Sequence, residues 1–139
     1  MHNEKTTIFI DGSSGTAGLR IYDRLAQRPD IDLLTLPPEL HHDIEAQREL
    51  LNRADIAFLC LPDAAAEEAA SWVENPDTVV LDTSTAHRTA PGWTYGLPEL
   101  HDTRKALKTA TRVAVPGCHA TGFIAPVAPL VELGLVPKN

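Results

Sequence analysis

Short apolar segments alternate with helix-forming segments along this chain, and that alternation limits the folds it can adopt. Five segments are nearly continuous in apolar, often β-branched residues: residues 6–10, 31–36, 55–61, 78–81 and 112–115. Such runs are typical of parallel strands covered on both faces. Helix formers at amphipathic spacing fill the intervals, over residues 18–28, 44–53, 64–73 and 99–108. This order predicts an α/β fold, doubly wound around a mostly parallel sheet.

The predicted helices carry signals at their ends. Asp63 precedes an alanine-rich run, where it is positioned to cap the third helix. A last helix over residues 120–133 is expected to end at Gly134, with its interior interrupted by Pro126 and Pro129.

Residues 83–98 differ from the rest of the chain, because they are polar, rich in turn formers and weakly periodic. They are predicted to form one long loop, which in a compact domain is often functional. The loop follows a strand, so it should lie at the carboxyl edge of the sheet. Open α/β folds bind their ligands at that edge.

Composition narrows the classes of partner. The 139 residues fit one ordinary domain, and their net charge of -7 argues against nucleic acid or an anionic membrane surface as the main partner. No secretory signal is visible, and the longest apolar stretches are too short to span a bilayer. Cys60 and Cys118 are interpreted as free thiols of a reducing compartment, so we expect a cytoplasmic protein. No Cys/His spacing fits a metal site.

A glycine turn follows the first predicted strand and precedes a helix. Glycines permit a tight turn and let backbone N–H groups approach a pyrophosphate closely. A purely structural turn is the alternative, but its place at the first strand-to-helix junction favours dinucleotide binding. The predicted cofactor-binding residues of the turn are Gly12, Ser13, Ser14, Gly15, Thr16, Ala17 and Gly18.

The sequence gives weaker evidence on whether the dinucleotide carries a 2′-phosphate. An acidic residue that reads the ribose should lie about twenty residues after the glycine turn. Glu39 has this distance but follows two prolines, and no aspartate ends the second strand. The missing aspartate favours the phosphorylated cofactor, NADP, although no residue can be identified as the reader of its 2′-phosphate.

Cys118 follows a Pro-Gly turn at the start of a predicted helix. The positive end of the helix dipole and the unpaired N–H groups of the first turn favour a thiolate, which is the nucleophilic form of cysteine. A small apolar plug is the alternative interpretation of such a residue. Cys60, inside a buried-strand pattern, is assigned to the core.

Arg88 lies in the polar loop, where it is either a surface charge or a bidentate ligand for phosphate or carboxylate. His87, His101 and His119 are possible bases, with no feature that distinguishes one of them. His41 and His42 are interpreted as part of a solvated loop.

Five blocks of this sequence, in this order, resemble the short-form N-acetyl-gamma-glutamyl-phosphate reductases of arginine biosynthesis. The blocks span residues 11–18, 58–63, 82–88, 95–100 and 116–122. The last block, Pro-Gly-Cys-His-Ala-Thr-Gly, is the specific one. The resemblance implies a Rossmann-like fold and an oxidoreductase related to aspartate-semialdehyde dehydrogenase and glyceraldehyde-3-phosphate dehydrogenase.

The resemblance also implies roles for particular residues. Cys118 would attack the acyl phosphate substrate and form a thioester, which hydride from NADPH would reduce to N-acetylglutamate 5-semialdehyde. Arg88 and His119 would bind substrate, while Pro62 and Ser84 would line the cofactor cleft.

Members of that family are longer than this chain. Their second, α+β domain supplies a general acid/base histidine, much of the substrate pocket and most of the interface of what is expected to be a homo-oligomer. No residue here matches that histidine. Residues 1–117 are therefore assigned to a dinucleotide-binding domain, and residues 118–139 to the catalytic-cysteine helix and the start of the further domain. Alone, the chain is expected to bind cofactor but to turn over poorly or not at all.

Two other interpretations stay open on the sequence. An enzyme similar to aspartate-semialdehyde dehydrogenase would share the turn, the cysteine and the thioester. A non-catalytic nucleotide-binding module, in which Cys118 is incidental or redox-sensing, is the alternative of a different class.

Overall fold

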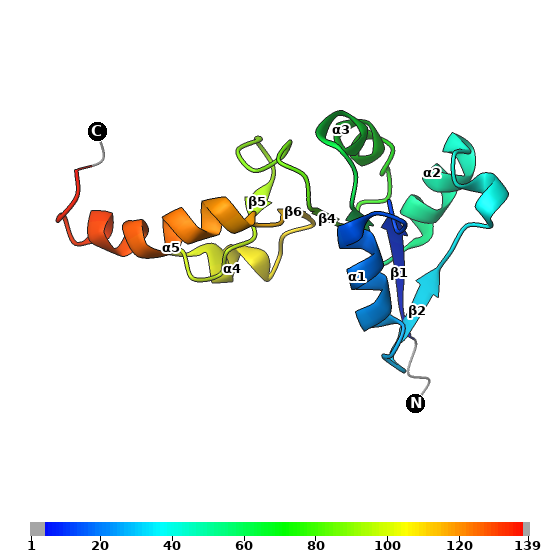
Figure 1. The fold of residues 1–139 in the computed structure, drawn as a ribbon, viewed down its shortest axis with the longest axis horizontal. Helices are drawn as coiled ribbons and strands as arrows, with labels where there is room; N and C mark the ends of the chain where they lie inside the picture. Colours follow the sequence, from blue (N-terminus) through cyan, green and yellow to red (C-terminus); the bar gives the residue numbers. More distant parts are fainter. Residues whose placement is uncertain (1–4, 138–139) are drawn as a thin grey trace.

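The computed structural model describes residues 5–137, and within them six parallel strands form one sheet in the order β2-β1-β3-β4-β6-β5 (Figure 1). The strands are β1 Thr6–Asp11, β2 Ile31–Leu34, β3 Ile56–Leu59, β4 Val79–Asp82, β5 Thr94–Tyr95 and β6 Arg112–Ala114. The predicted α/β class with a parallel sheet is confirmed. Because all strands are parallel, their carboxyl ends meet at one edge.

The helices follow from right-handed crossovers between parallel strands. These place α1 (Thr16–Leu25) on one face of the sheet and α2 (Ile44–Arg53) and α3 (Asp63–Ser71) on the other. A short 3₁₀ helix, η1 (Pro38–Leu40), precedes α2, and α4 (Thr103–Leu107) lies against β5. The core between the sheet and α2 and α3 contains Phe9, Leu50, Leu51, Leu59, Ala69 and Val80.

Two predictions about the elements near the polar loop are wrong. Residues 83–98 are not one loop, because Thr94–Tyr95 forms the edge strand β5 beside β6. The predicted helix over residues 99–108 is reduced to α4, since Asp102 adopts a left-handed conformation with φ 60° and the helix begins only after it.

Two predictions about helix ends are also wrong. Pro62, not Asp63, is the N-cap of α3, because the Asp63 carboxylate accepts hydrogen bonds from Thr85 instead. The helix α5 (Cys118–Glu132) runs through Pro126 and Pro129 without interruption. A proline removes its own N–H, and its ring crowds the carbonyl four residues earlier. Here those carbonyls belong to the exposed residues Gly122 and Ala125, where water can replace the lost partner.

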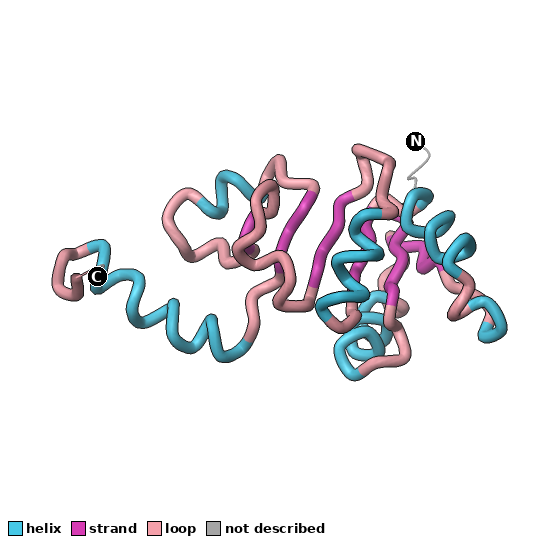
Figure 2. Tube along the Cα trace, turned by 90° about the horizontal axis from the view of Figure 1, so that it is seen from above, coloured by secondary structure: helices cyan, strands magenta, loops and turns pink. Residues whose placement is uncertain are grey.

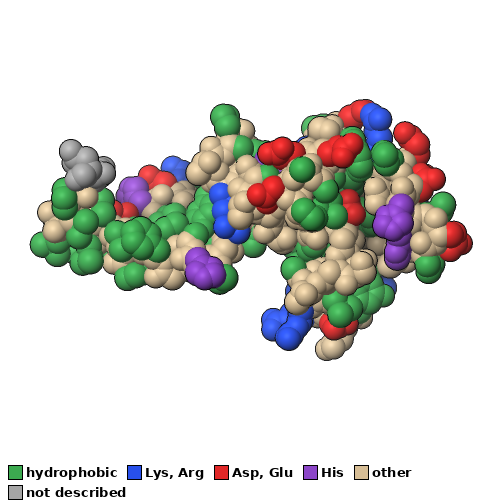
Figure 3. All heavy atoms as spheres, turned by 45° about the horizontal axis from the view of Figure 1, so that its top comes forward, with side chains coloured by type: hydrophobic (Ala, Val, Ile, Leu, Met, Phe, Trp, Pro, Cys, Tyr) green, Lys and Arg blue, Asp and Glu red, His purple; other side chains and the backbone are tan. Residues whose placement is uncertain are grey.

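Helix α5 extends away from the sheet, as Figures 1 and 2 show from two directions. None of its residues is buried, and hydrophobic side chains gather over it in Figure 3. Phe123 and Leu133 are 68% and 73% exposed. Among the described residues no helix has both the length and the apolar character needed to cross a membrane.

Candidate functional site

The glycine turn between β1 and α1 is built on close backbone approaches. Gly12 has φ 78°, and a Cβ on it would lie 2.9 Å from the carbonyl carbon of Cys60 and closer still to its oxygen. A Cβ on Gly18 would lie 2.8 Å from Cα of Ser13, within the same turn. Gly15 is the N-cap of α1, and its N–H donates to the carbonyl oxygen of Gly12 at 3.0 Å. These approaches fold the turn tightly over the end of β1.

The N-terminus of α1 has no side chain capping it and no acidic residue in its first turn. The first N–H groups of a helix lack partners within the helix and carry the positive end of its dipole. Thr16 and Ala17 are exposed there, whereas Gly18 is buried under the turn. The geometry suits an anion such as a pyrophosphate.

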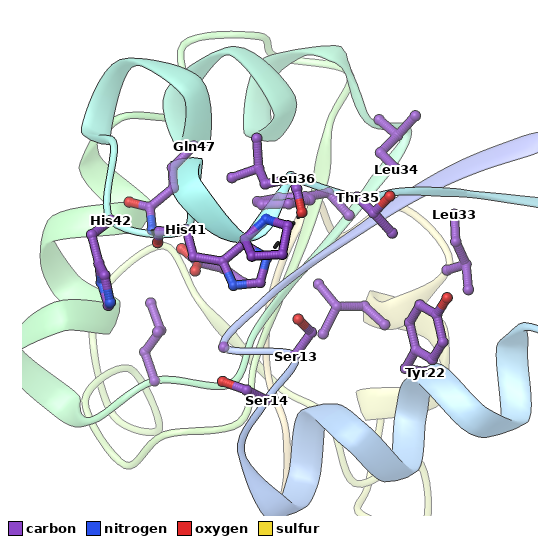
Figure 4. A pocket seen from close by; sticks show the side chains of 16 residues that line it. Ser13, Ser14, Tyr22, Leu33, Leu34, Thr35, Leu36, His41, His42 and Gln47 are labelled. Atoms are coloured by element: carbon purple, nitrogen blue, oxygen red, sulfur yellow. Dashed lines mark hydrogen bonds between the residues drawn. The ribbon is translucent and has the colours of Figure 1, made fainter.

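A cavity of about 530 Å³ opens beside this turn, between the carboxyl ends of β1 and β2 (Figure 4). Gly12, Ser13 and Ser14 line it from the glycine turn, and Tyr22 lines it from α1. The opposite wall comes from the segment that follows β2 and includes Thr35, Leu36, Pro38, His41, His42 and Gln47.

Asp11, at the end of β1, is the only acidic residue that lines this cavity among the described residues, and it is 5% exposed. Burial raises the pKa of its carboxyl, and a hydrogen bond from the backbone of Gly12 partly opposes the shift. Glu39 lies in η1 and does not line the cavity. The ribose-reading position after β2 is therefore not acidic.

Sequence reasoning missed the second wall of the cavity. His41 and His42 are exposed on the connection between η1 and α2, as predicted, and they also line this cavity. No motif marks them, because their contribution depends on β2 lying next to β1. Pro62 and Ser84, predicted from the resemblance, lie outside this cavity, after β3 and β4 at the same edge of the sheet.

A buried polar network follows β4. Asp82 is fully buried, and its two carboxylate oxygens accept from the N–H of Ser84 at 2.8 Å and from the Ser84 hydroxyl at 2.7 Å. His87 Nδ1 lies 2.6 Å from Asp82 Oδ2, and the His87 ring stacks on Trp93 at a centroid distance of 3.9 Å. With its ring enclosed in this way, His87 supports the loop and is not aimed at a substrate.

Arg88 follows this network and reaches the turn before α5. A Cβ on Gly117 would lie 2.5 and 2.6 Å from the two terminal nitrogens of Arg88, so the guanidinium lies directly against Gly117. The Nε of Arg88 is buried and has no hydrogen-bond partner among the described residues. Gly117 and Arg88 are 29 positions apart in the sequence, and they meet because β4 and β6 are adjacent strands.

Cys118 is the first residue of α5, directly after Gly117. Both Cys118 and His119 are exposed, and Sγ of Cys118 lies 3.5 Å from Nδ1 of His119. Gly117 is the N-cap, and no side chain caps the helix. The exposed thiol thus lies at the positive end of a helix, one residue after the glycine that the Arg88 guanidinium contacts.

Cys60 provides the contrast. It is partly buried below the glycine turn, and burial raises the pKa of its thiol. The thiol therefore stays protonated at neutral pH. Among residues 5–137 no group of three His, Cys, Asp or Glu side chains could hold a metal ion.

Comparison with known families covers most of the chain. Residues 7–110 match the family model described as "Semialdehyde dehydrogenase, NAD binding domain". The chain belongs to this semialdehyde dehydrogenase family. Membership agrees with the parallel sheet and the glycine turn, and it assigns a nicotinamide dinucleotide as the class of cofactor.

Within the semialdehyde dehydrogenase family, the similar curated proteins are N-acetyl-gamma-glutamyl-phosphate reductases, which confirms the resemblance seen in the sequence. The protein from Pseudomonas putida is 52% identical over 133 residues, which is 95% of this chain and 42% of the relative. The protein from Chelativorans sp. is 53% identical over 133 residues, 95% of this chain and 43% of the relative. The chain thus spans less than half the length of these relatives.

Solved structures of the family share the fold at low identity. Aspartate semialdehyde dehydrogenase from Candida albicans, solved with NADP, has a TM-score of 0.64 at 17% identity, over 91% of this chain and 47% of that one. The enzyme from Francisella tularensis also reaches 0.64, at 14% identity, over 93% of this chain and 41% of that one.

Proposed function

We propose that this chain is the cofactor-binding portion of an NADP-dependent N-acetyl-gamma-glutamyl-phosphate reductase, with Cys118 as its nucleophile. The observation that carries the proposal is the meeting of Cys118, Gly117 and Arg88 at the sheet edge that also holds the dinucleotide cavity. The identity of about half to the relatives that bear this name supports the choice of reaction.

The residues present fit a dinucleotide. The turn leaves no room for a Cβ at Gly12 or Gly18, so its backbone can approach a ligand closely. The start of α1 offers free N–H groups, and the hydroxyls of Ser13 and Ser14 lie next to them. The apolar part of the wall, Leu33, Leu34 and Leu36, suits the body of an adenosine. Gly12, Ser13, Ser14 and the first turn of α1 would hold the pyrophosphate, and Pro62 and Ser84 would border the remainder of the cofactor. When bound, the reduced nicotinamide would supply hydride.

The chemistry at Cys118 follows from its surroundings. A thiolate at the start of α5 is stabilised by the amide dipoles of the helix, and it can attack the carbonyl carbon of an acyl phosphate. The C–O bond to phosphate then breaks, and inorganic phosphate leaves with the bonding electrons. The acyl group stays on Sγ as a thioester, which accepts hydride more readily than a carboxylate does.

Arg88 is placed to hold the phosphate that leaves. Its guanidinium has several donors in a plane, which match phosphate oxygens in pairs. Its buried Nε lacks a partner among the described residues, and an unpaired donor of this kind favours an anion beside it. His119, 3.5 Å from Sγ, is placed next to the acyl group and would contact substrate.

A chimera tests this function. Residues 1–139 of this chain replace the matching part of the Pseudomonas putida relative, and phosphate-dependent reduction of NADP is measured with N-acetylglutamate 5-semialdehyde. We expect activity with this substrate and much less with aspartate semialdehyde. Cys118→Ser should abolish the activity, because an alcohol is a far weaker nucleophile than a thiolate.

Cys60→Ser is the matched control, since that thiol is partly buried below the glycine turn, and it should retain activity. Equal activity in the Cys118→Ser chimera, or a preference for aspartate semialdehyde, would contradict the proposed function. Arg88→Gln should raise the KM for phosphate.

A further inference from the structure

The wall of the cavity opposite the glycine turn carries two adjacent histidines, for which the proposed function gives no role. His41 and His42 line the cavity from the connection between η1 and α2. The other titratable side chains that line it are Asp11 of β1 and Tyr22 of α1. Among the described residues, no lysine or arginine lines it.

The segment that holds these histidines is fixed by local hydrogen bonds. Nε2 of His41 lies 2.9 Å from the carbonyl oxygen of Leu36. A carbonyl can only accept, so Nε2 carries the proton and Nδ1 is left for another partner. Gln47 donates to the carbonyl oxygen of His41 at 2.7 Å, and Asp43 caps α2 by accepting from the N–H of Ala46 at 2.9 Å.

The two histidines lie where the adenosine ribose of a bound dinucleotide is expected. With the pyrophosphate at the glycine turn, the adenosine ribose lies near the end of β2, where folds of this kind read the 2′ position. Figure 4 shows Ser13 and Ser14 coming from the turn and His41 and His42 coming from the segment after β2. No acidic side chain of that segment lines the cavity, so a 2′-hydroxyl finds no carboxylate there.

We propose that His41 and His42 bind the 2′-phosphate of NADP and thereby determine the preference of this chain for the phosphorylated cofactor. The inference rests on the proposed function, because it requires the adenosine half of the cofactor in this cavity. His42 lines the cavity beside His41.

The hydrogen bond to Leu36 also determines how His41 can meet a phosphate. Because Nε2 already donates to Leu36, Nδ1 can donate to a phosphate oxygen only when the ring carries a second proton. Asp11 and Tyr22 face the same cavity, and Glu39 and Asp43 flank the histidines in the sequence. All four residues are present in wild type and variants alike.

Calorimetric titration of the 139-residue chain with NADPH and with NADH tests the inference, since the two ligands differ only at the 2′ position. We expect tighter binding of NADPH. In His41→Gln/His42→Gln the affinity for NADPH should fall about tenfold or more, as for the loss of charge-assisted hydrogen bonds, while that for NADH stays unchanged. His101→Gln is the matched control, because His101 is exposed beside Asp102, on the connection that leads into α4, and does not line the cavity.

The outcomes separate the inference from the proposed function. If both cofactors bind and the double variant keeps the wild-type preference for NADPH, the inference is overturned and the dinucleotide cavity stands. If neither cofactor binds to a chain that circular dichroism shows to be folded, the proposed function fails, and the inference fails with it.

Discussion

At the scale of single residues, two glycines of the turn are required by the fold before any ligand is considered. Gly12 has a positive φ, and a Cβ on it would clash with the carbonyl group of Cys60. A Cβ on Gly18 would clash with the backbone of Ser13. Gly92 has almost the same φ, 79° against 78°, but nothing lies within 4 Å of a Cβ there. The two positions therefore separate the cost of a left-handed backbone from the cost of a steric clash.

We expect Gly12→Ala to destabilise the chain more than Gly92→Ala. The strained backbone alone should cost about 1 kcal/mol at Gly92, and the added clash at Gly12 should bring the total to about 3 kcal/mol or more. Urea denaturation of both variants measures the difference. Equal midpoints would show that the turn relaxes away from Cys60 without cost.

At the scale of elements, the segment after β4 is fixed at two points. The buried carboxylate of Asp82 holds Ser84 and His87, and the carboxylate of Asp63 at the start of α3 accepts from the N–H and the hydroxyl of Thr85. Both carboxylates precede Arg88, whose guanidinium lies on Gly117. The position of Arg88 against Gly117 is therefore set by hydrogen bonds made up to several residues earlier in the chain.

We expect Asp63→Asn to lower the melting temperature slightly at pH 7 and by less near pH 3. The hydrogen bonds from the Thr85 hydroxyl and then its N–H hold the pKa of Asp63 below its usual value of 3.8. A depressed pKa stabilises the folded chain above pH 4, and this contribution is lost as the pH falls through the folded pKa.

Thermal denaturation at the two pH values measures this effect. Asp32→Asn is the control, because Asp32 is exposed on β2 and makes no side-chain hydrogen bond among the described residues. A difference between wild type and Asp63→Asn that is as large at pH 3 as at pH 7 would point to a cause other than the ionised carboxylate.

At the scale of the whole molecule, a packed sheet and a projecting helix coexist. The sheet and helices α2 and α3 enclose the core, whereas α5 buries none of its residues. Its apolar side chains form a patch with Phe123, Leu130 and Leu133 among its exposed members. Contiguous apolar surface of this kind drives association in water.

We expect the chain to self-associate with rising concentration, and Phe123→Ser/Leu133→Ser to reduce that association. Sedimentation velocity over a range of concentrations measures it. Leu19→Ser is the control, because Leu19 is 52% exposed but lies on α1, away from the patch. NADPH binding should be equal in all three proteins. A wild-type chain that stays monomeric at every concentration would contradict the prediction.

Much of the fold could be predicted from the sequence because its signals are local. Continuous apolar runs marked β1, β3 and β4, amphipathic spacing gave α2 its observed bounds, and the glycine spacing located the turn. The two-residue strand β5 could not be predicted, since it has too few residues to show a period and exists only because β6 offers it an edge. The prediction that Asp63 caps α3 is wrong because its carboxylate binds Thr85, 22 positions away in the sequence.

The sequence by itself determined the α/β class, the glycine turn and a cysteine at a helix start, since each depends on neighbouring residues and on the steric limits of the backbone. Only the tertiary structure decided which distant residues share a site. The order β2-β1-β3-β4-β6-β5 brings His41 and His42 to the cavity beside Ser13 and lays Arg88 on Gly117. Strand order depends on contacts between segments far apart in the chain, and no local pattern records it.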